Sequence, residues 1–293
     1  MKVLITGGRG MVGKHLQEIL PNASYIGRED CDLTLWKEVE YMMFLQKPDH
    51  IIHLAAKVGG IQDNIAKPAE YFDDNILMNT HILRASLQFK VKRLTGILST
   101  CIYPDTVENY PMKEEDMFLG PPAISNFSYG YAKRCMAVQI DAYNKQYNTE
   151  YNYLTPCNLY SEHDNFNNES KMHFMTALLK KIKSSTNTLN LLGTGKPLRQ
   201  FMYAGDLARV IKEVIDKDIT DSFNVATSEN LSINEMANIS LKVLNKKLKI
   251  NYSKPELDGQ FRKDACNKKL LNNIPNFKFT NFEEGIKKIY SNI

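Results

Sequence analysis

The first 160 residues alternate between short apolar runs and longer segments in which apolar residues recur with helical spacing. Short apolar runs predict buried strands, and apolar positions three and four residues apart predict amphipathic helices. Strands that alternate with helices in this way indicate an α/β fold built on a parallel sheet. The pattern predicts strands at 2–6, 24–27, 49–56, 93–100 and 151–158, and helices at 11–20, 68–89 and 125–147.

The regular alternation breaks at Ser161. We therefore expect a first domain of residues 1–160, to which about 200–227 return, and a smaller mixed α/β domain made of 161–199 and 228–293. Beyond Ser161 the pattern predicts loops at 164–170 and 184–188, strands at 189–192, 200–203, 223–226 and 248–252, and helices at 206–216, 232–245 and 283–290.

A glycine-rich loop follows the first predicted strand directly. Its glycines satisfy both Gly-x-Gly-x-x-Gly (8, 10 and 13) and the looser Gly-x-x-Gly-x-x-Gly (7, 10 and 13). The earlier glycines permit a tight turn and close approach to a pyrophosphate, and the last lets helix and strand pack closely. Between a strand and a helix, this motif predicts a Rossmann-type doubly wound sheet that binds a dinucleotide. The contacts expected from this loop are Gly7, Gly10, Met11, Val12 and Gly13.

Two arginines near this loop bear on which dinucleotide is bound. An NAD enzyme usually places an acidic residue after the second strand to hold the ribose hydroxyls. Here that strand ends at Arg28, and Arg9 lies within the glycine loop. Guanidinium groups suit a 2′-phosphate, so the pattern favours NADP, although exposed arginines beside Glu29 and Asp30 are the alternative interpretation. Further cofactor contacts are expected at Asp32, Leu33, Leu54, Ala55 and Ala56.

The candidate chemistry lies in the pentapeptide Tyr-Gly-Tyr-Ala-Lys at 129–133. On a helix, Tyr129 and Lys133 are four residues apart and share one face, where a cation lowers a phenol pKa that is ordinarily about 10. An ordinary amphipathic helix offers the same spacing, so the pair alone does not establish catalysis. Ser99 and Cys101, which an extended chain would point to one side, end the fourth strand, where parallel sheets place ligands.

Composition narrows the function classes. The 293 residues are 43% hydrophobic and 24% charged, which is ordinary for a globular protein that buries a sizeable core. A net charge of +4 without a basic block argues against nucleic-acid binding. No apolar run approaches the ~18 residues of a membrane span, and no signal peptide is evident. Five cysteines without paired spacing argue against a zinc site or disulfide framework, so we expect no metal and a cytoplasmic location.

The glycine loop, Ser99 and the pair Tyr129 and Lys133 together resemble the extended short-chain dehydrogenase/reductases. Longer stretches resemble the GDP-L-fucose synthase branch of that family, and the resemblance covers nearly the whole chain. These stretches are Gly-Met-Val-Gly at 10–13, His-Leu-Ala-Ala-Lys-Val-Gly-Gly-Ile at 53–61, Cys-Ile-Tyr-Pro at 101–104, Asn-Leu-Tyr at 158–160, His-Asp-Asn-Phe at 163–166 and Gly-Thr-Gly-Lys-Pro-Leu-Arg at 193–199.

The resemblance implies NADPH-dependent reduction of a GDP-linked 4-keto sugar. By this resemblance Tyr129 donates a proton to the sugar oxygen, Lys133 holds the nicotinamide ribose, and Ser99 polarises the carbonyl. Members of the branch also epimerise C3 and C5, and Cys101 and His173 match their acid–base pair. The resemblance further implies a homodimer through the helices at about 69–89 and 125–147. The substrate contacts that it implies are Asn158, Lys180, Arg199 and Lys263.

The chain departs from the branch in several motifs. The usual Asn-Leu-Tyr-Gly-Pro ends here in Ser161-Glu162, and Lys180 replaces an arginine, which loses the bidentate fork. Three alternatives remain open. One is a C4 reductase without epimerisation, acting on a GDP-4-keto-heptose in capsule biosynthesis; another is a nucleotide-sugar 4-epimerase with bound NAD. A binding protein that has lost catalysis is the third. Taken without the resemblance, Cys101 is an inert core thiol and His173 a surface histidine.

Overall fold

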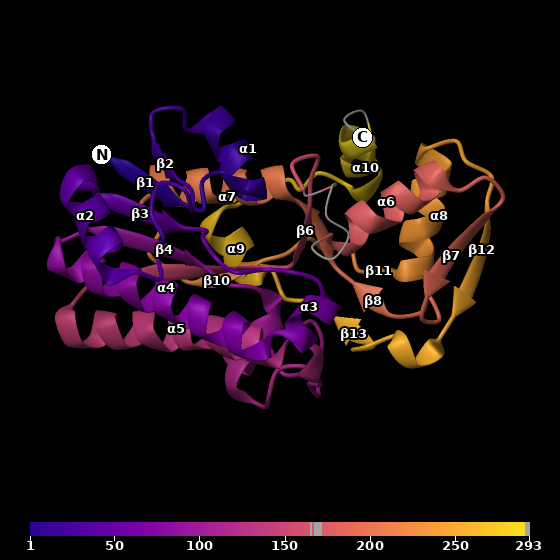
Figure 1. The fold of residues 1–293 in the computed structure, drawn as a ribbon, viewed down its shortest axis with the longest axis horizontal. Coiled ribbons are helices and arrows are strands. Elements are labelled where there is room, and N and C mark those ends of the chain that lie inside the picture. Colours follow the sequence, from indigo (N-terminus) through magenta and orange to yellow (C-terminus); the bar gives the residue numbers. More distant parts are fainter. Residues whose placement is uncertain (165, 167–171, 291–293) are drawn as a thin grey trace.

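The computed structural model describes residues 1–164, 166 and 172–290 (Figure 1). Its centre is a six-stranded sheet in the order β10-β5-β4-β3-β1-β2, in which every neighbouring pair is parallel. This confirms the predicted Rossmann-type doubly wound sheet. The strands are β1 (Val3–Thr6), β2 (Ser24–Ile26), β3 (His50–His53), β4 (Arg93–Ile97), β5 (Asn152–Pro156) and β10 (Phe223–Val225).

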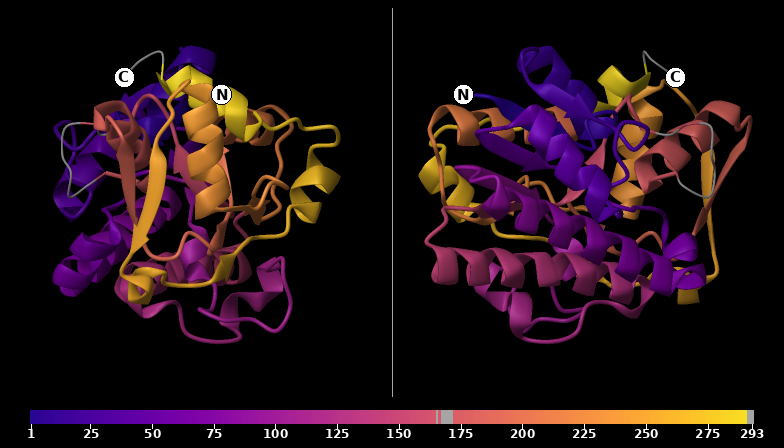
Figure 2. Two further views of the ribbon diagram at one scale, coloured as in Figure 1. Left: turned by 90° about the vertical axis from the view of Figure 1, so that its right-hand side faces the viewer. Right: turned by 60° about the vertical axis from the view of Figure 1, so that its left-hand side comes forward.

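Helices cover both faces of this sheet (Figures 1 and 2). On one face lie α1 (Met11–Ile19) and α7 (Ala204–Asp216). On the other lie α2 (Trp36–Gln46), α4 (Pro68–Gln88) and α5 (Phe127–Tyr147), with α4 and α5 side by side. Proline at the first helical position suits the start of α4, and Asn148, with φ of 54°, ends α5 in the left-handed conformation that closes many helices.

The smaller part of the chain packs against one end of this unit (Figure 1). It contains a three-stranded sheet in the order β11-β8-β13 and the parallel strand pairs β7-β12 and β6-β9. Its helices are α6 (Phe174–Ser184), α8 (Ile233–Val243) and α10 (Phe282–Tyr290). Its strands are β6 (Asn158–Tyr160), β7 (Thr188–Leu192), β8 (Leu198–Arg199), β9 (Phe201–Tyr203), β11 (Leu231–Ser232), β12 (Lys249–Ser253) and β13 (Arg262–Lys263).

Several predicted strands differ from the observed ones. The third ends at His53 and the fourth at Ile97, because the chain leaves the sheet there to form loops. The strand predicted at 151–158 divides into β5 and β6, since Pro156 has no amide hydrogen to continue the ladder and the chain then pairs with β9. The sequence pattern did not predict α6. It also did not predict α2, α3 (Ile61–Ala66) or α9 (Lys268–Asn273).

Two clusters of buried apolar side chains hold the molecule together. The larger surrounds the six-stranded sheet and includes Leu4, Ile51 and Leu154. The smaller lies among α6, α8 and α10 and includes Leu178 and Met236. Leu270 of α9 belongs to the larger cluster, so part of the segment assigned to the second domain packs on the sheet. The domain division stays a prediction.

Two further expectations concern loops and membranes. Of the loop predicted at 164–170, residues 165 and 167–170 lie outside the described residues. Within the part of the chain that the structure describes, no helix combines the length and apolar character that crossing a bilayer demands.

Candidate active site

The carboxyl end of β1 forms a cradle at the point where the strand order reverses. β1 pairs with β2 on one side and β3 on the other, and open α/β sheets bind ligands at such a point. Gly7 has φ of +68°, and a Cβ there would lie 2.7 Å from the backbone nitrogen of Ala55. A Cβ on Gly13 would overlap the Gly8 carbonyl. Both positions therefore require glycine, and the loop is left open for a ligand.

The first turn of α1 follows this cradle directly, and the amide groups of a first turn have no partner within the helix. Gly10 caps the helix without a side-chain hydrogen bond, and its first turn contains no acidic residue. A helix terminus of this kind attracts anions such as a pyrophosphate. Met11 and Val12 in that turn are half-buried. So are the three residues after β3, namely Leu54, Ala55 and Ala56. The predicted contacts thus surround one loop whose geometry fits a dinucleotide.

The two arginines expected at a 2′-phosphate lie near the end of β2 in surface ion pairs. Arg9 pairs with Glu29 and with Asp30, at 2.6 Å for the latter. Arg28 lies 3.6 Å from Asp32 and its side chain is 83% exposed. Exposed ion pairs contribute only about 0–1 kcal/mol, so a phosphate can compete with these carboxylates. Leu33 is buried beside them.

The end of β4 carries the predicted catalytic hydroxyl and thiol. After β4 the chain enters a 3₁₀ turn over Thr100–Ile102, and Ser99 Oγ accepts a hydrogen bond from the Cys101 amide at 3.3 Å. The expectation that an extended chain aligns Ser99 with Cys101 is therefore wrong. The cap of this turn, rather than the alternation of a strand, brings the two residues together.

Tyr129 and Lys133 lie one turn apart near the start of α5, as their spacing predicts. Burial raises the pKa of Tyr129 above its usual range, the neighbouring Cys101 adds to this, and a hydrogen bond with Ser99 opposes it. Lys133 is 1% exposed, its Nζ donates to the Ile97 carbonyl at 2.7 Å, and burial lowers its pKa to about 8.

The sequence led us to expect that Lys133 lowers the pKa of Tyr129, and this expectation is wrong, because the pKa is raised. The ammonium group is directed to the backbone of β4, and desolvation of the phenol dominates. Tyr129 therefore keeps its proton at neutral pH, which is the state that a proton donor requires.

Lys263 joins this group from the smaller part of the chain. Its Nζ lies 3.1 Å from Cys101 Sγ. Burial by itself raises the pKa of Cys101, but Lys263, the Ser99 hydroxyl and the Asn126 side chain together lower it below the usual value for a thiol. Lys263 of β13 is in register with Arg199 of β8, whose guanidinium also interacts electrostatically with Cys101. The thiol therefore faces cationic groups. Lys263, expected at a phosphate, lies against Cys101.

The remaining predicted site residues are His173, Asn158 and Lys180. His173 precedes α6, its Nδ1 lies 2.9 Å from Asp164, and that carboxylate raises its pKa. Among the described residues, no hydrogen bond or ion pair joins His173 to Cys101. Asn158 donates from Nδ2 to the Gln200 carbonyl at 2.9 Å, and Lys180 is half-buried on α6.

The structure adds two residues that the sequence did not single out. The Asn126 side chain interacts with Cys101, and its Oδ1 is buried without a hydrogen-bond partner in the described part of the chain. A Cβ on Gly130 would lie 2.5 Å from the Cys101 carbonyl oxygen, so this glycine lets α5 approach the 3₁₀ turn. The only signal in the sequence was their position beside Tyr129.

Gly130→Ala is expected to destabilise the protein by about 1–3 kcal/mol and to slow its reaction, because the added methyl group meets backbone that must shift. The free energy of unfolding in urea and the steady-state rate both test this. Gly120→Ala is the matched control, since its Cβ would make ordinary contact at 3.4 Å with the Pro104 side chain. Equal stability of the two variants would contradict the close packing.

Comparison with known proteins adds independent information. The profile of the NAD dependent epimerase/dehydratase family matches residues 3–226. A GDP-L-fucose synthase from Dictyostelium discoideum is 34% identical over 299 residues, covering 98% of this chain and 93% of that protein. The crystal structure of a GDP-L-fucose synthetase from Naegleria fowleri bound to NADP matches with a TM-score of 0.89 and 32% identity, over 99% of this chain and 91% of that one. MlghC, a GDP-mannoheptose C4 reductase from Campylobacter jejuni with NADP bound, matches with a TM-score of 0.87 and 25% identity, over 99% and 97% of the two chains.

Proposed function

This chain belongs to the NAD dependent epimerase/dehydratase family, and within it to the GDP-L-fucose synthase branch, and from that premise we propose that it reduces C4 of a GDP-linked 4-keto sugar with NADPH. The observation that carries the proposal is the group formed by Ser99, Cys101, Tyr129 and Lys263 at the carboxyl end of β4. This group and the glycine cradle both lie at the carboxyl ends of the parallel strands β4 and β1, so a dinucleotide held in the cradle would bring reducing equivalents to the same edge of the sheet as the proton donor.

The cofactor, when bound, supplies the hydride that C4 accepts. The cradle at Gly7 and the first turn of α1 would hold its pyrophosphate, and Arg9 and Arg28 would hold the 2′-phosphate. Lys133 would bind the nicotinamide ribose, and the Ile97 carbonyl at the end of β4 already holds its Nζ in place.

Proton transfer to the sugar falls to Tyr129. As C4 gains the hydride, its oxygen develops negative charge, and the neutral phenol donates its proton to give the alcohol. The Ser99 hydroxyl, which also bonds with Tyr129, stabilises the same oxygen. General acid catalysis of this kind contributes about 10²–10⁴-fold to a rate.

Epimerisation at C3 and C5 is the second activity that we propose. The protons on these carbons are acidic because the C4 ketone flanks both, and their removal gives an enolate whose oxygen Ser99 and Tyr129 can stabilise. A thiolate is the form of Cys101 that can act as the base, and Lys263 favours that form. His173 is assigned as the acid that returns a proton to the opposite face; Asp164 raises its pKa, which favours the protonated form that such an acid needs.

The substrate side of the site is cationic. Lys263, Arg199 and Lys180 suit the diphosphate of a GDP-sugar, and Asn158, the first residue of β6, is assigned as a further polar contact of the substrate. The alternative substrate is a GDP-4-keto-heptose reduced without epimerisation. The cationic environment of Cys101 favours the bifunctional reaction over that alternative.

Stoichiometric oxidation of NADPH is the result expected when the protein is mixed with GDP-4-keto-6-deoxymannose. Absorbance at the NADPH band and chromatography of the nucleotide sugar should report one NADPH consumed for each sugar reduced. A 4-epimerase that recycles bound NAD would convert sugar with no net oxidation, and that outcome would overturn the proposal. Repeating the assay with a GDP-4-keto-heptose identifies the preferred substrate.

We also propose a cytoplasmic homodimer in which α4 and α5 of two subunits pack together. These helices lie side by side and expose apolar side chains to solvent. The exposed large apolar residues of these two helices are Phe72, Leu77, Phe127, Val138 and Tyr147.

A further inference from the structure

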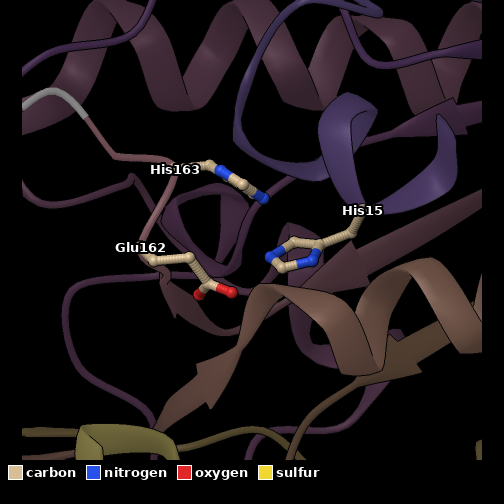
Figure 3. A group of neighbouring side chains, drawn as sticks. All are labelled: His15, Glu162 and His163. Carbon is tan, nitrogen blue, oxygen red and sulfur yellow. The ribbon is translucent and has the colours of Figure 1, made fainter. Parts of the chain in front are cut away.

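A group of potential metal ligands lies outside the site described above. The side chains of His15, Glu162 and His163 point toward one another (Figure 3). Their ligand atoms all lie within 4.8 Å of one another, and His15 is buried. His15 comes from α1, whereas Glu162 and His163 follow β6, so two distant segments of the chain meet here.

Polar groups around this cluster hold its side chains in place. Ser161 Oγ lies 2.8 Å from His15 Nε2 and donates a hydrogen bond of 3.2 Å to Glu162 Oε2. The Tyr203 hydroxyl donates to Glu162 Oε1 at 2.7 Å. The rings of His15 and His163 have centroids 4.8 Å apart. A buried tyrosine that orients a carboxylate is the outer-shell support that metal ligands usually have.

Charge around the cluster also favours a cation. Glu18, on the exposed side of α1, has Oε1 3.9 Å from His163 Nε2 and provides a second carboxylate. The Lys288 ammonium acts against the binding of a cation. It lies over the Tyr203 ring at 4.8 Å and is paired with Glu284. Among the described residues that act electrostatically on His15, apart from His163, two carboxylates stand against one ammonium, so their summed charge is negative.

We propose that His15, Glu162 and His163 form a binding site for a divalent transition-metal ion of the Zn²⁺ class. Two imidazole nitrogens and one carboxylate are ligands that Zn²⁺ prefers, and a fourth position is left for water or for Glu18. The side chains already converge, and a bound ion would replace the hydrogen bonds of Ser161 with His15 and Glu162.

Ser161 and Glu162 depart from the motif of the branch that this sequence resembles. In the branch that the sequence resembles, the positions of Ser161 and Glu162 are glycine and proline, neither of which has a ligand atom. Cysteine spacing, on which the expectation of no metal rests, bears on thiolate sites and not on a site built from histidine and glutamate. A bound ion would tie α1, which follows the cofactor cradle, to the segment after β6 and so hold the two parts of the molecule in register.

Titration of the metal-free protein with ZnCl₂ tests this proposal. We expect one ion bound per chain in calorimetry, and a melting temperature that rises with zinc concentration, because a ligand that binds only the folded state stabilises it. His15→Gln and Glu162→Gln should each weaken binding by more than about 100-fold, beyond the loss expected for an outer-shell partner. Tyr203→Phe, which removes such a partner, should weaken it by about 10–100-fold.

His81→Gln is the matched control, because His81 lies on α4, across the sheet from α1, and bonds to the Leu33 carbonyl. It should bind zinc as the wild-type chain does. Circular dichroism shows whether each variant is folded, and His163→Gln offers a third ligand variant on a loop. Zinc binding that is undiminished in folded ligand variants, or no saturable binding by the wild-type protein, would overturn the proposal.

Discussion

Tyr129→Phe is expected to lower the rate of C4 reduction by about 10²–10⁴-fold, the contribution of a positioned proton donor. The ring still fills its place on α5, whereas the hydroxyl that donates to the sugar oxygen is lost. The dissociation constant of NADPH, measured by fluorescence titration, should change little. The pH profile of the wild-type enzyme should show no loss of reduction from ionisation of Tyr129 in the neutral range, because burial raises the pKa of this phenol.

Tyr131→Phe provides the control for that variant. Tyr131 lies on the same helix, stacks edge-to-face on Phe127 and carries the Arg134 guanidinium over its ring at 5.0 Å. Loss of its hydroxyl preserves those ring contacts, so reduction should stay close to the wild-type rate. If Tyr129→Phe turned over like Tyr131→Phe, Tyr129 would not be the proton donor.

Lys263→Met is expected to reduce deuterium incorporation at C3 and C5 by at least about tenfold at pH 7 in D₂O. The contact between Nζ and Cys101 Sγ opposes the effect of burial and keeps the pKa of the thiol below its usual value. Without the ammonium the pKa rises, and each unit of that rise lowers the thiolate fraction about tenfold at a pH below both values. Exchange should return as pH passes through the raised pKa.

Two comparisons separate this effect from weaker substrate binding. Cys101→Ser should abolish exchange at every pH, since a hydroxyl is not ionised in this range. Lys180→Met should raise the KM for the substrate without moving the pH profile. Mass spectrometry of the sugar measures exchange by all three variants, at saturating substrate for the pH profiles and over a series of substrate concentrations for KM. Exchange by Lys263→Met with an unshifted pH profile would mean that Lys263 does not activate Cys101.

Local patterns in the chain were sufficient for most of the fold. Apolar runs and helical periodicity located the sheet, and glycine spacing located the cofactor loop, because turns and buried faces impose residue types within a few positions. The four-residue spacing of Tyr129 and Lys133 likewise predicted that both lie on one face of a helix, which is α5. The sequence did not predict the 3₁₀ turn at Cys101, because an apolar run does not show where a strand stops pairing.

The electrostatic character of the site depended on long-range contacts. Lys263 lies 162 positions from Cys101, and His15 lies 146 positions from Ser161, so no local pattern relates them. Burial and partners set a pKa, which is why Tyr129 differs from the expectation based on Lys133 alone. Residue order thus determined the sheet, the cofactor loop and the family of this protein. Packing of its two parts decided which charges face the thiol and which side chains can share a metal ion.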